Sequence, residues 1–275
     1  MAQTIGLTGR VVDFASGLKS LAWYQGLAKK YIRGVILDTY SRDVTGNTSR
    51  ALQGQTAVGY FQGYDAAAWS LPETATTRAE EAILTLHRLG YPTGGILYLD
   101  CEDAARVDAS DLAAWVEAWA TVVTGAGFVA GMYVGAGWPM TPEELYALPH
   151  ITSYWKSVST VPTVATRGYA AYQVLGNVQV DGELVDVDIL TPDYLGDIPM
   201  FMTEADTVEE PTVTPKAPST ASPTRYALVT VRAGMTVWGL CNQYHTTLEA
   251  INAANHLTLE TDRDLRIGMT LRIPT

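Results

Sequence analysis

Short apolar runs that alternate with helix-like stretches constrain the fold of this 275-residue chain more than any other feature. The apolar runs are residues 9–14, 34–40, 57–64, 96–103, 129–135, 151–155, 169–174 and 184–190. Helical spacing of apolar residues lies between several of them, at residues 18–31, 77–89, 108–124 and from Thr141 onwards. Near-continuous apolar strands that alternate with helices are typical of a parallel sheet. Eight such strands predict an α/β fold, a small closed (β/α) TIM-like barrel. Because the last three runs lack proper helices between them, we expect an irregular barrel that is partly open or antiparallel on that side.

Carboxylates close several of these runs, and the run Ile96–Asp103 is the most informative. Side chains alternate faces along a strand, so Asp100 and Glu102 share one face with Tyr98. Two acids on one face at the end of an apolar run are costly unless solvent, a partner or a substrate meets them. Active sites of such barrels lie at the carboxyl ends of the strands, where we expect all of these acids to converge. The alternative is an acid that serves only solubility or caps a turn.

The charge and the cysteines exclude several classes of function. The chain has 18 Lys and Arg against 29 Asp and Glu, a net charge of −11, which argues against nucleic-acid binding. Its two cysteines fall in separate predicted domains, so neither a disulfide framework nor a cysteine metal site is expected. The histidines show no ligand spacing, and we predict no metal and no cofactor. No apolar run is long enough to cross a membrane, and the first residues do not resemble a signal peptide.

A stretch rich in Pro, Ser and Thr divides the chain. We predict a first domain over residues 1–198, an extended linker over residues 199–225, and a second domain over residues 226–275. The acidic excess lies in the first of these domains. The linker's expected role is to keep two folded units apart.

The last 50 residues predict a strand, two helices and a returning strand, an α+β module. Its motifs are Gly234-Met-Thr-Val-Trp238, Tyr244-His-Thr-Thr247, Asn255 and Gly268-Met-Thr-Leu-Arg-Ile-Pro274. In these motifs the module resembles a LysM domain, with Met235 where the family usually has Asp. The resemblance implies binding of glycans that contain N-acetylglucosamine, such as peptidoglycan or chitin. It places the glycan groove at Gly234, Met235, Thr236, Leu265, Arg266 and Ile267. The alternative is a LysM fold kept only as an interaction module.

Short motifs on the barrel strands carry a second resemblance. They are Val12-Asp-Phe-Ala-Ser16, Tyr98-Leu-Asp-Cys-Glu102, Gly131-Met-Tyr133, Tyr172-Gln173 and Val185-Asp-Val-Asp188. Together they resemble the glycoside hydrolase family 25 muramidases and the related glycoside hydrolase-like domains. The middle of the barrel is closer to the latter group.

Cleavage of a glycosidic bond requires an acid that keeps its proton and a group that stabilises an oxocarbenium-like state. Glu102 is the predicted general acid, because repulsion from Asp100 and Asp103 favours its protonated form. Asp100 would orient Glu102 or the acetamido group of the substrate, whose own oxygen would act as the nucleophile. Asp13 and Asp188 would complete the catalytic set from the first and eighth strands. The predicted substrate-binding residues are Asp38, Tyr60, Tyr133, Trp155, Gln173 and Asp186. Alternatively, the aromatic residues are barrel core, and Asp186 or Asp188 only satisfies backbone amides.

These observations predict a peptidoglycan-degrading glycosidase, muramidase-like, with a wall-binding LysM domain. Without a signal peptide the layout resembles a phage endolysin or a virion-borne lysin, which would act from the host cytoplasm on the cell wall. Its partners would be peptidoglycan or another N-acetylglucosamine glycan and other virion proteins. One alternative is a non-catalytic wall-binding or virion structural protein that keeps the barrel as a scaffold. Another is a bacterial spore or wall-remodelling enzyme.

Overall fold

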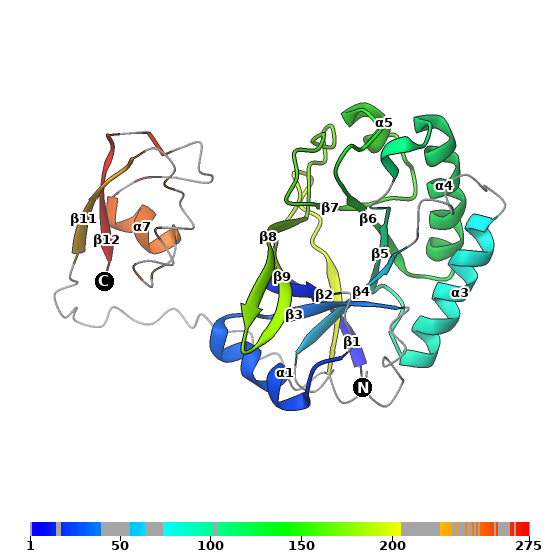
Figure 1. Ribbon diagram of the computed structural model, residues 1–275, viewed down its shortest axis with the longest axis horizontal. Coiled ribbons are helices and arrows are strands. Elements are labelled where there is room, and N and C mark those ends of the chain that lie inside the picture. The colour runs from blue at the N-terminus through cyan, green and yellow to red at the C-terminus, as the bar shows by residue number, and fades with distance from the viewer. Residues whose placement is uncertain are drawn as a thin grey trace. The chain divides into compact units, whose positions relative to one another are not determined.

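The computed structural model divides the chain into two compact units, Met1–Glu210 and Pro211–Thr275. The residues it describes are 2–14, 18–39, 56–63, 74–101, 104–204, 226–232, 235, 240, 244, 246, 248–255, 257, 265–266 and 268–274. The first unit holds the barrel and the second holds the LysM module (Figure 1).

Eight of the described strands close into a barrel, as the sequence predicts (Figure 1). They are β2 (Gly9–Phe14), β3 (Gly34–Asp38), β4 (Ala57–Gly63), β5 (Ile96–Asp100), β6 (Val129–Val134), β7 (Ser153–Lys156), β8 (Ala171–Val180) and β9 (Glu183–Leu190). The sheet order β4-β3-β2-β9-β8-β7-β6-β5 returns on itself because β4 also pairs with β5. The strands from β2 to β8 pair in parallel wherever they meet, whereas β9 is antiparallel to both of its neighbours, β8 and β2. The predicted irregular side is therefore confirmed, and it is antiparallel.

A two-stranded ribbon extends the sheet at the amino end of the barrel. Strand β1 (Ala2–Gly6) pairs antiparallel with β10 (Met200–Glu204), and β10 also pairs with β4. Phe201 of β10 is fully buried in the barrel interior with the first residues of β4 and β5, so the ribbon closes this end. A Cβ on Gly59 would lie 2.8 Å from the Phe201 ring, which explains the glycine there. The barrel domain therefore extends past the predicted boundary at residue 198.

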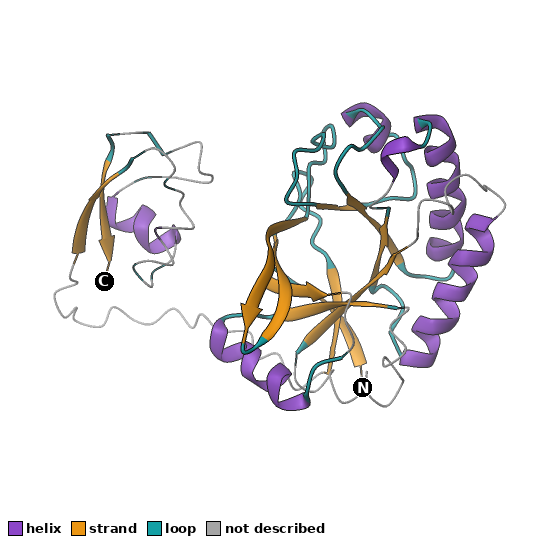
Figure 2. Ribbon diagram, viewed as in Figure 1, coloured by secondary structure: helices purple, strands orange, loops and turns teal. Residues whose placement is uncertain are grey.

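Helices cover the outside of the barrel (Figure 2). They are α1 (Leu21–Leu27) with the 3-10 turn η1 (Ala28–Lys30), α3 (Thr74–Leu89), the turn η3 (Ala104–Arg106), α4 (Ala109–Gly125) and α5 (Pro142–Tyr146). Helices α3 and α4 pack side by side, and the Trp115 indole N–H donates to Thr74 Oγ1 across their contact at 3.2 Å. Helix α3 begins at Thr74, three residues before the helical spacing that the sequence shows from residue 77. Asp108 and Thr141 do cap α4 and α5, each by accepting a backbone N–H of the first turn.

The alternation of side chains along the strands produces two apolar layers. The outer layer packs strands against helices and includes Tyr60, Leu97 and Leu99. The inner layer fills the barrel and includes Phe61, Tyr98 and other residues on the opposite strand faces. A side chain's parity on its strand therefore decides whether it faces the helices or the barrel interior.

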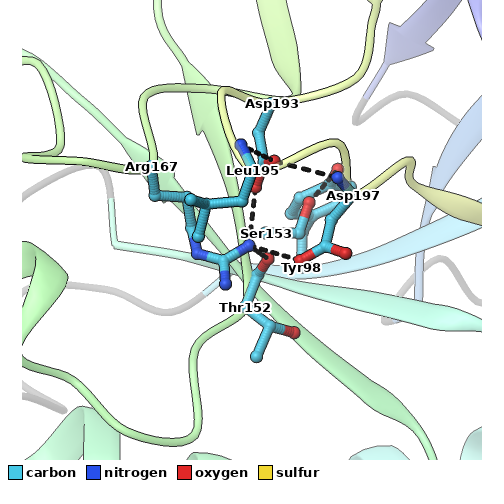
Figure 3. A network of polar contacts seen from close by, with 7 residues as sticks. All are labelled: Tyr98, Thr152, Ser153, Arg167, Asp193, Leu195 and Asp197. Atoms are coloured by element: carbon cyan, nitrogen blue, oxygen red, sulfur yellow. Dashed lines mark hydrogen bonds and ion pairs between the residues drawn. The ribbon is translucent and has the colours of Figure 1, made fainter.

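An ionic network fastens the segment between β9 and β10 at the amino end of the barrel (Figure 3). Arg167 Nη1 lies 2.6 Å from Asp193 Oδ2 and 2.7 Å from Asp197 Oδ2, and it donates to the Thr152 carbonyl at 2.9 Å. Asp193 Oδ1 accepts the backbone N–H groups of Leu195 and Asp197, each at 2.9 Å. Every oxygen of the buried Asp193 carboxylate is thereby satisfied.

The second unit has the strand and helix arrangement of a LysM domain. Strand β11 (Tyr226–Thr230) pairs antiparallel with β12 (Thr270–Pro274), and α7 (Leu248–Asn255) packs against β12. Asn255 fastens the two elements, because its Nδ2 donates to the Arg272 carbonyl and its Oδ1 accepts the Arg272 N–H, both at 2.7 Å. Most of the first predicted helix lies outside the described residues. In the described part of the chain, no helix has the length and apolarity that crossing a membrane requires.

Candidate active site

A pocket of about 320 Å³ opens at the carboxyl end of the barrel strands. It is lined by Asp13, Phe14, Phe61, Asp100, Tyr133, Trp155, Gln173, Asn177, Leu184, Val185 and Asp186. Six of these are among the predicted site residues: Asp13, Asp100, Tyr133, Trp155, Gln173 and Asp186. Residues from seven different strands of one barrel thus meet at a single cavity, at the end where barrel enzymes build their active sites.

The reversal of β9 brings its acids to this pocket. In the antiparallel register Asp186 lies opposite Asp13, and Asp188 lies opposite Val11. Asp186 therefore reaches the pocket from the first half of its strand, whereas Asp188 lies farther along the strand and does not line the pocket. The expectation that all the acids end their strands is wrong for these two. The prediction that Asp188 and Asp13 come from neighbouring strands agrees with the observed order.

Asp188 lies beneath the pocket floor. Its side chain is 0 % exposed, and its Oδ1 accepts the Trp155 indole N–H at 2.8 Å. Burial raises the pKa of the Asp188 carboxyl well above its usual range, and the charge of Asp13 and a hydrogen bond shared with it act in the same direction. To a smaller extent, the Trp155 hydrogen bond lowers this pKa and the charge of Asp186 raises it. Asp188 does not line the pocket, so it contacts a ligand only through Asp13 or Trp155.

A chain of hydrogen bonds crosses one side of the pocket. The Tyr133 hydroxyl donates to Gln173 Oε1 at 3.0 Å, and Gln173 Nε2 donates to Asp186 Oδ2 at 2.8 Å. The backbone N–H of Asn177 donates to Asp186 Oδ1 at 2.6 Å. Both oxygens of Asp186 are therefore acceptors, which holds its carboxylate in a fixed orientation.

The hairpin of β8 and β9 forms one wall and supplies Asn177, Leu184 and Val185 to the pocket. Its turn, Asp181-Gly182, has positive φ at both residues (48° and 83°), as a tight two-residue hairpin turn requires. This wall was not predicted from the sequence, although Asp-Gly between two alternating runs is the signal that predicts a hairpin.

Helix α1 and the residues next to it brace this hairpin. The Trp23 indole N–H donates to the Val180 carbonyl at 2.8 Å. Lys30 Nζ lies 2.9 Å from Asp181 Oδ1, and Lys19 Nζ lies 2.9 Å from Glu183 Oε2. The wall is thus held at its tip by contacts that are far from it in the sequence.

Besides Asp188, two described residues of the predicted site, Tyr60 and Asp38, do not line the pocket. Tyr60 is 0 % exposed in the outer layer, edge-to-face with Tyr91 at 4.9 Å between ring centroids, so the expectation that it contacts sugars is corrected. Side chains alternate along β4, and Phe61 takes the inner face, so its neighbour Tyr60 faces the helices. Asp38 ends β3 on the inner face but does not line the pocket. Glu102, the predicted general acid, lies outside the described residues, two positions after Asp100.

The predicted LysM groove is described in part. Met235 packs against the apolar core of the module, and its Sδ accepts the Arg232 N–H at 3.4 Å. Leu265 also packs against this core, and Arg266 is exposed. The groove residues Gly234, Thr236 and Ile267 lie outside the described residues. Met235 thus has a packing role at the position where the family usually has Asp.

Within the described ranges, no group of three or more His, Cys, Asp or Glu side chains has the arrangement to hold a metal ion. The chemistry available to the described residues is hydrogen bonding, proton transfer between carboxyl groups and stacking on aromatic rings.

Comparisons with known sequences identify both units. The profile of the Rv2525c-like, glycoside hydrolase-like domain matches residues 13–190, and the LysM profile matches residues 229–274. No curated protein matches the chain.

Solved structures with a similar barrel come from several bacteria. The Tat-secreted protein Rv2525c of Mycobacterium tuberculosis, in complex with L-tartrate, aligns with a TM-score of 0.53 and 15% identity over 68% of this chain and 100% of its own. A bacterial lysozyme of Streptomyces coelicolor aligns with a TM-score of 0.52 and 12% identity, over 67% of this chain and 93% of its own. The modular autolysin LytC of Streptococcus pneumoniae aligns with a TM-score of 0.50 and 13% identity, over 67% of this chain and 47% of its own. At these identities the likeness establishes a shared fold.

Proposed function

Because the chain belongs to the family of Rv2525c-like, glycoside hydrolase-like domains and also carries a LysM domain, we propose that it is a cell-wall glycosidase. The observation that carries this proposal is the convergence of Asp13, Asp100 and Asp186 on one pocket with Tyr133 and Trp155. Carboxylates beside aromatic rings suit a sugar, because the rings stack on its apolar face and the acids bind its hydroxyls. The substrate we propose is peptidoglycan or another glycan that contains N-acetylglucosamine.

In the proposed reaction, Glu102 protonates the leaving oxygen of the glycosidic bond. Asp100 lines the pocket two residues earlier and orients the acetamido group, whose own oxygen attacks the anomeric carbon. Enzymes that use the substrate in this way need no second carboxylate as nucleophile. Asp13 contacts the sugar, while Asp188 acts behind it as a positioning residue.

The LysM domain would concentrate the barrel on its substrate. A tethered glycan-binding module makes the second binding event intramolecular, which raises the local concentration of the pocket at the wall. We propose a free lysin or an exported wall-remodelling enzyme as the biological setting. A more specific version of this proposal is a phage or virion origin with virion partners, whereas the similarity to the Tat-secreted protein Rv2525c supports export instead.

The test is the release of reducing ends from purified peptidoglycan by the full-length chain. We expect Glu102→Gln to lower this rate by about 100-fold or more, since a general acid contributes roughly 10²–10⁴-fold. Glu117→Gln, a matched change of a partly buried glutamate that pairs with His150, serves as the control and is expected to keep the rate. Native-like activity of Glu102→Gln would refute the assignment of the acid.

A non-catalytic wall-binding role is the second candidate, and one observation favours it. Asp186 has both oxygens bound by Gln173 and Asn177, and Asp188 is fully buried beneath the pocket, so one pocket acid and the acid below it serve the structure. A native chain that binds peptidoglycan but releases no reducing ends between pH 4 and 8 would support this role.

A further inference from the structure

The hydrogen-bond chain Tyr133–Gln173–Asp186 has a fixed direction. A backbone N–H can only donate, so the 2.6 Å contact from Asn177 N makes Asp186 Oδ1 an acceptor. Asp186 Oδ2 meets the side chain of Gln173 at 2.8 Å. The amide of Gln173 satisfies this carboxylate only by turning its NH₂ group toward it.

This orientation of Gln173 determines what Tyr133 can do. With its NH₂ group on Asp186, Gln173 presents its carbonyl oxygen to the Tyr133 hydroxyl at 3.0 Å. A hydroxyl has a single proton, and here it is directed to Gln173. Any group that meets Tyr133 Oη from the pocket must therefore donate a hydrogen bond to it.

We infer that Asp186 is a specificity-determining residue, which acts through Gln173 to make Tyr133 select ligand groups that donate over groups that accept. The inference rests on the proposed function, in which the pocket takes an amino-sugar glycan. A free ammonium group on the sugar nitrogen presents only donors, whereas an acetamido group presents one N–H and a carbonyl acceptor. The wall of the pocket at Tyr133 therefore favours glucosamine units and the N–H side of N-acetylglucosamine units.

A single substitution reverses the direction of these hydrogen bonds. In Asp186→Asn, the new amide oxygen still accepts the Asn177 N–H, so its NH₂ group faces Gln173. Gln173 then satisfies the new donor by turning its carbonyl toward it and its own NH₂ toward Tyr133. The Tyr133 hydroxyl becomes an acceptor from Gln173, and its proton turns toward the pocket.

The binding test uses the full-length chain with two probes, the tetramer of N-acetylglucosamine and the tetramer of glucosamine, measured by calorimetry. We expect Asp186→Asn to lower the ratio of glucosamine to N-acetylglucosamine affinity by about tenfold, the effect of one net hydrogen bond. Binding at the LysM domain is common to all variants and does not change this comparison.

Two controls separate hydrogen-bond direction from charge. In a Tyr133→Phe background, Asp186→Asn removes the same charge but has no hydroxyl to reverse, so we expect less than about a twofold further change of the ratio. Asp181→Asn removes one charge from the exposed tip of the same hairpin and should leave the ratio within about twofold. A ratio that Asp186→Asn leaves unchanged, or changes equally with Phe at position 133, overturns the inference.

A second measurement needs no ligand, so it separates failure of this inference from failure of the proposed function. Nuclear Overhauser contacts of the Gln173 NH₂ protons should point to Asp186 and Asn177 in the native chain. In Asp186→Asn they should move to the ring protons of Tyr133. Contacts between this NH₂ group and the Tyr133 ring in the native chain would contradict the inference even if the protein hydrolyses peptidoglycan.

Discussion

The two ends of the barrel handle buried aspartates in opposite ways. At the amino end, Asp193 is 5 % exposed and meets the Arg167 guanidinium at 2.6 Å, together with two backbone N–H groups (Figure 3). At the carboxyl end, Asp188 is 0 % exposed and meets an indole and a second carboxyl, that of Asp13. No Lys, Arg or His is among the described residues that line the pocket there. A buried acid at the amino end thus has a cation as its partner and fastens a loop, whereas Asp188 at the carboxyl end favours its protonated form.

The largest expected effect is a loss of stability when the ion pair at the amino end of the barrel is removed. Arg167→Ala leaves the buried Asp193 carboxylate without its cation, and loss of one partner of a buried ion pair costs about 3–5 kcal/mol. We expect the thermal midpoint of the barrel unit to fall accordingly, measured by calorimetry on the full chain. Arg78→Ala removes an arginine from an exposed ion pair on α3, so its midpoint should change little. Equal effects of the two substitutions would refute the contrast between the ends of the barrel.

The next effect concerns pH at the carboxyl end. Because the folded pKa of Asp188 is raised, the unfolded chain releases this proton first, so native stability falls as pH rises above the unfolded value of about 4. Asp188→Asn mimics the protonated form and keeps an acceptor for Trp155. The substitution should therefore gain stability over the native chain by up to about 1.4 kcal/mol for each pH unit in that window. Urea unfolding between pH 4 and pH 8 measures the difference in stability between Asp188→Asn and the native chain. A difference that shrinks as pH rises would mean that Asp188 is ionised.

A smaller effect concerns the hairpin wall of the pocket. Trp23→Phe keeps an aromatic ring on α1 but removes the hydrogen bond to the Val180 carbonyl, which costs about 1 kcal/mol. We expect faster hydrogen exchange of the backbone amides of β8 and β9 near the turn, with little change in β5 and β6. Uniform acceleration across the barrel would show that α1 supports the whole fold rather than this wall.

The smallest effect tests the charges at the tip of the hairpin. Lys30 and Asp181 are both substantially exposed, so their ion pair contributes less than about 0.5 kcal/mol. Lys30→Ala should leave the thermal midpoint and the hairpin exchange rates almost unchanged. A loss as large as that of Trp23→Phe would mean that the ion pair, and not the indole, holds the wall.

The sequence predicts the strands and the pocket acids well because both follow from local patterns. Asp13 and Asp100 end apolar runs, and their parity places them on the inner face. Tyr60 was misplaced because an aromatic residue suits either face of a buried strand, and only the register with its neighbours decides between them. The hydrogen bond between Asp188 and Trp155 could not be predicted from the sequence either, since Trp155 comes from a strand 33 residues away. The closing ribbon was missed because β1 and β10 have only five residues each and little apolar periodicity of their own.

That ribbon has a consequence for how the protein is made. Ala2 pairs with Glu204, so strand β1 finds its partner only after some 200 more residues have been synthesised. Pairing over such a separation closes a very long loop and is slow. Until β10 is released, Phe201 is missing from the barrel interior and the amino end stays open. The barrel domain therefore completes its fold only once β10 has been synthesised, and truncation before residue 200 would leave a nascent barrel with an exposed core for chaperones to protect.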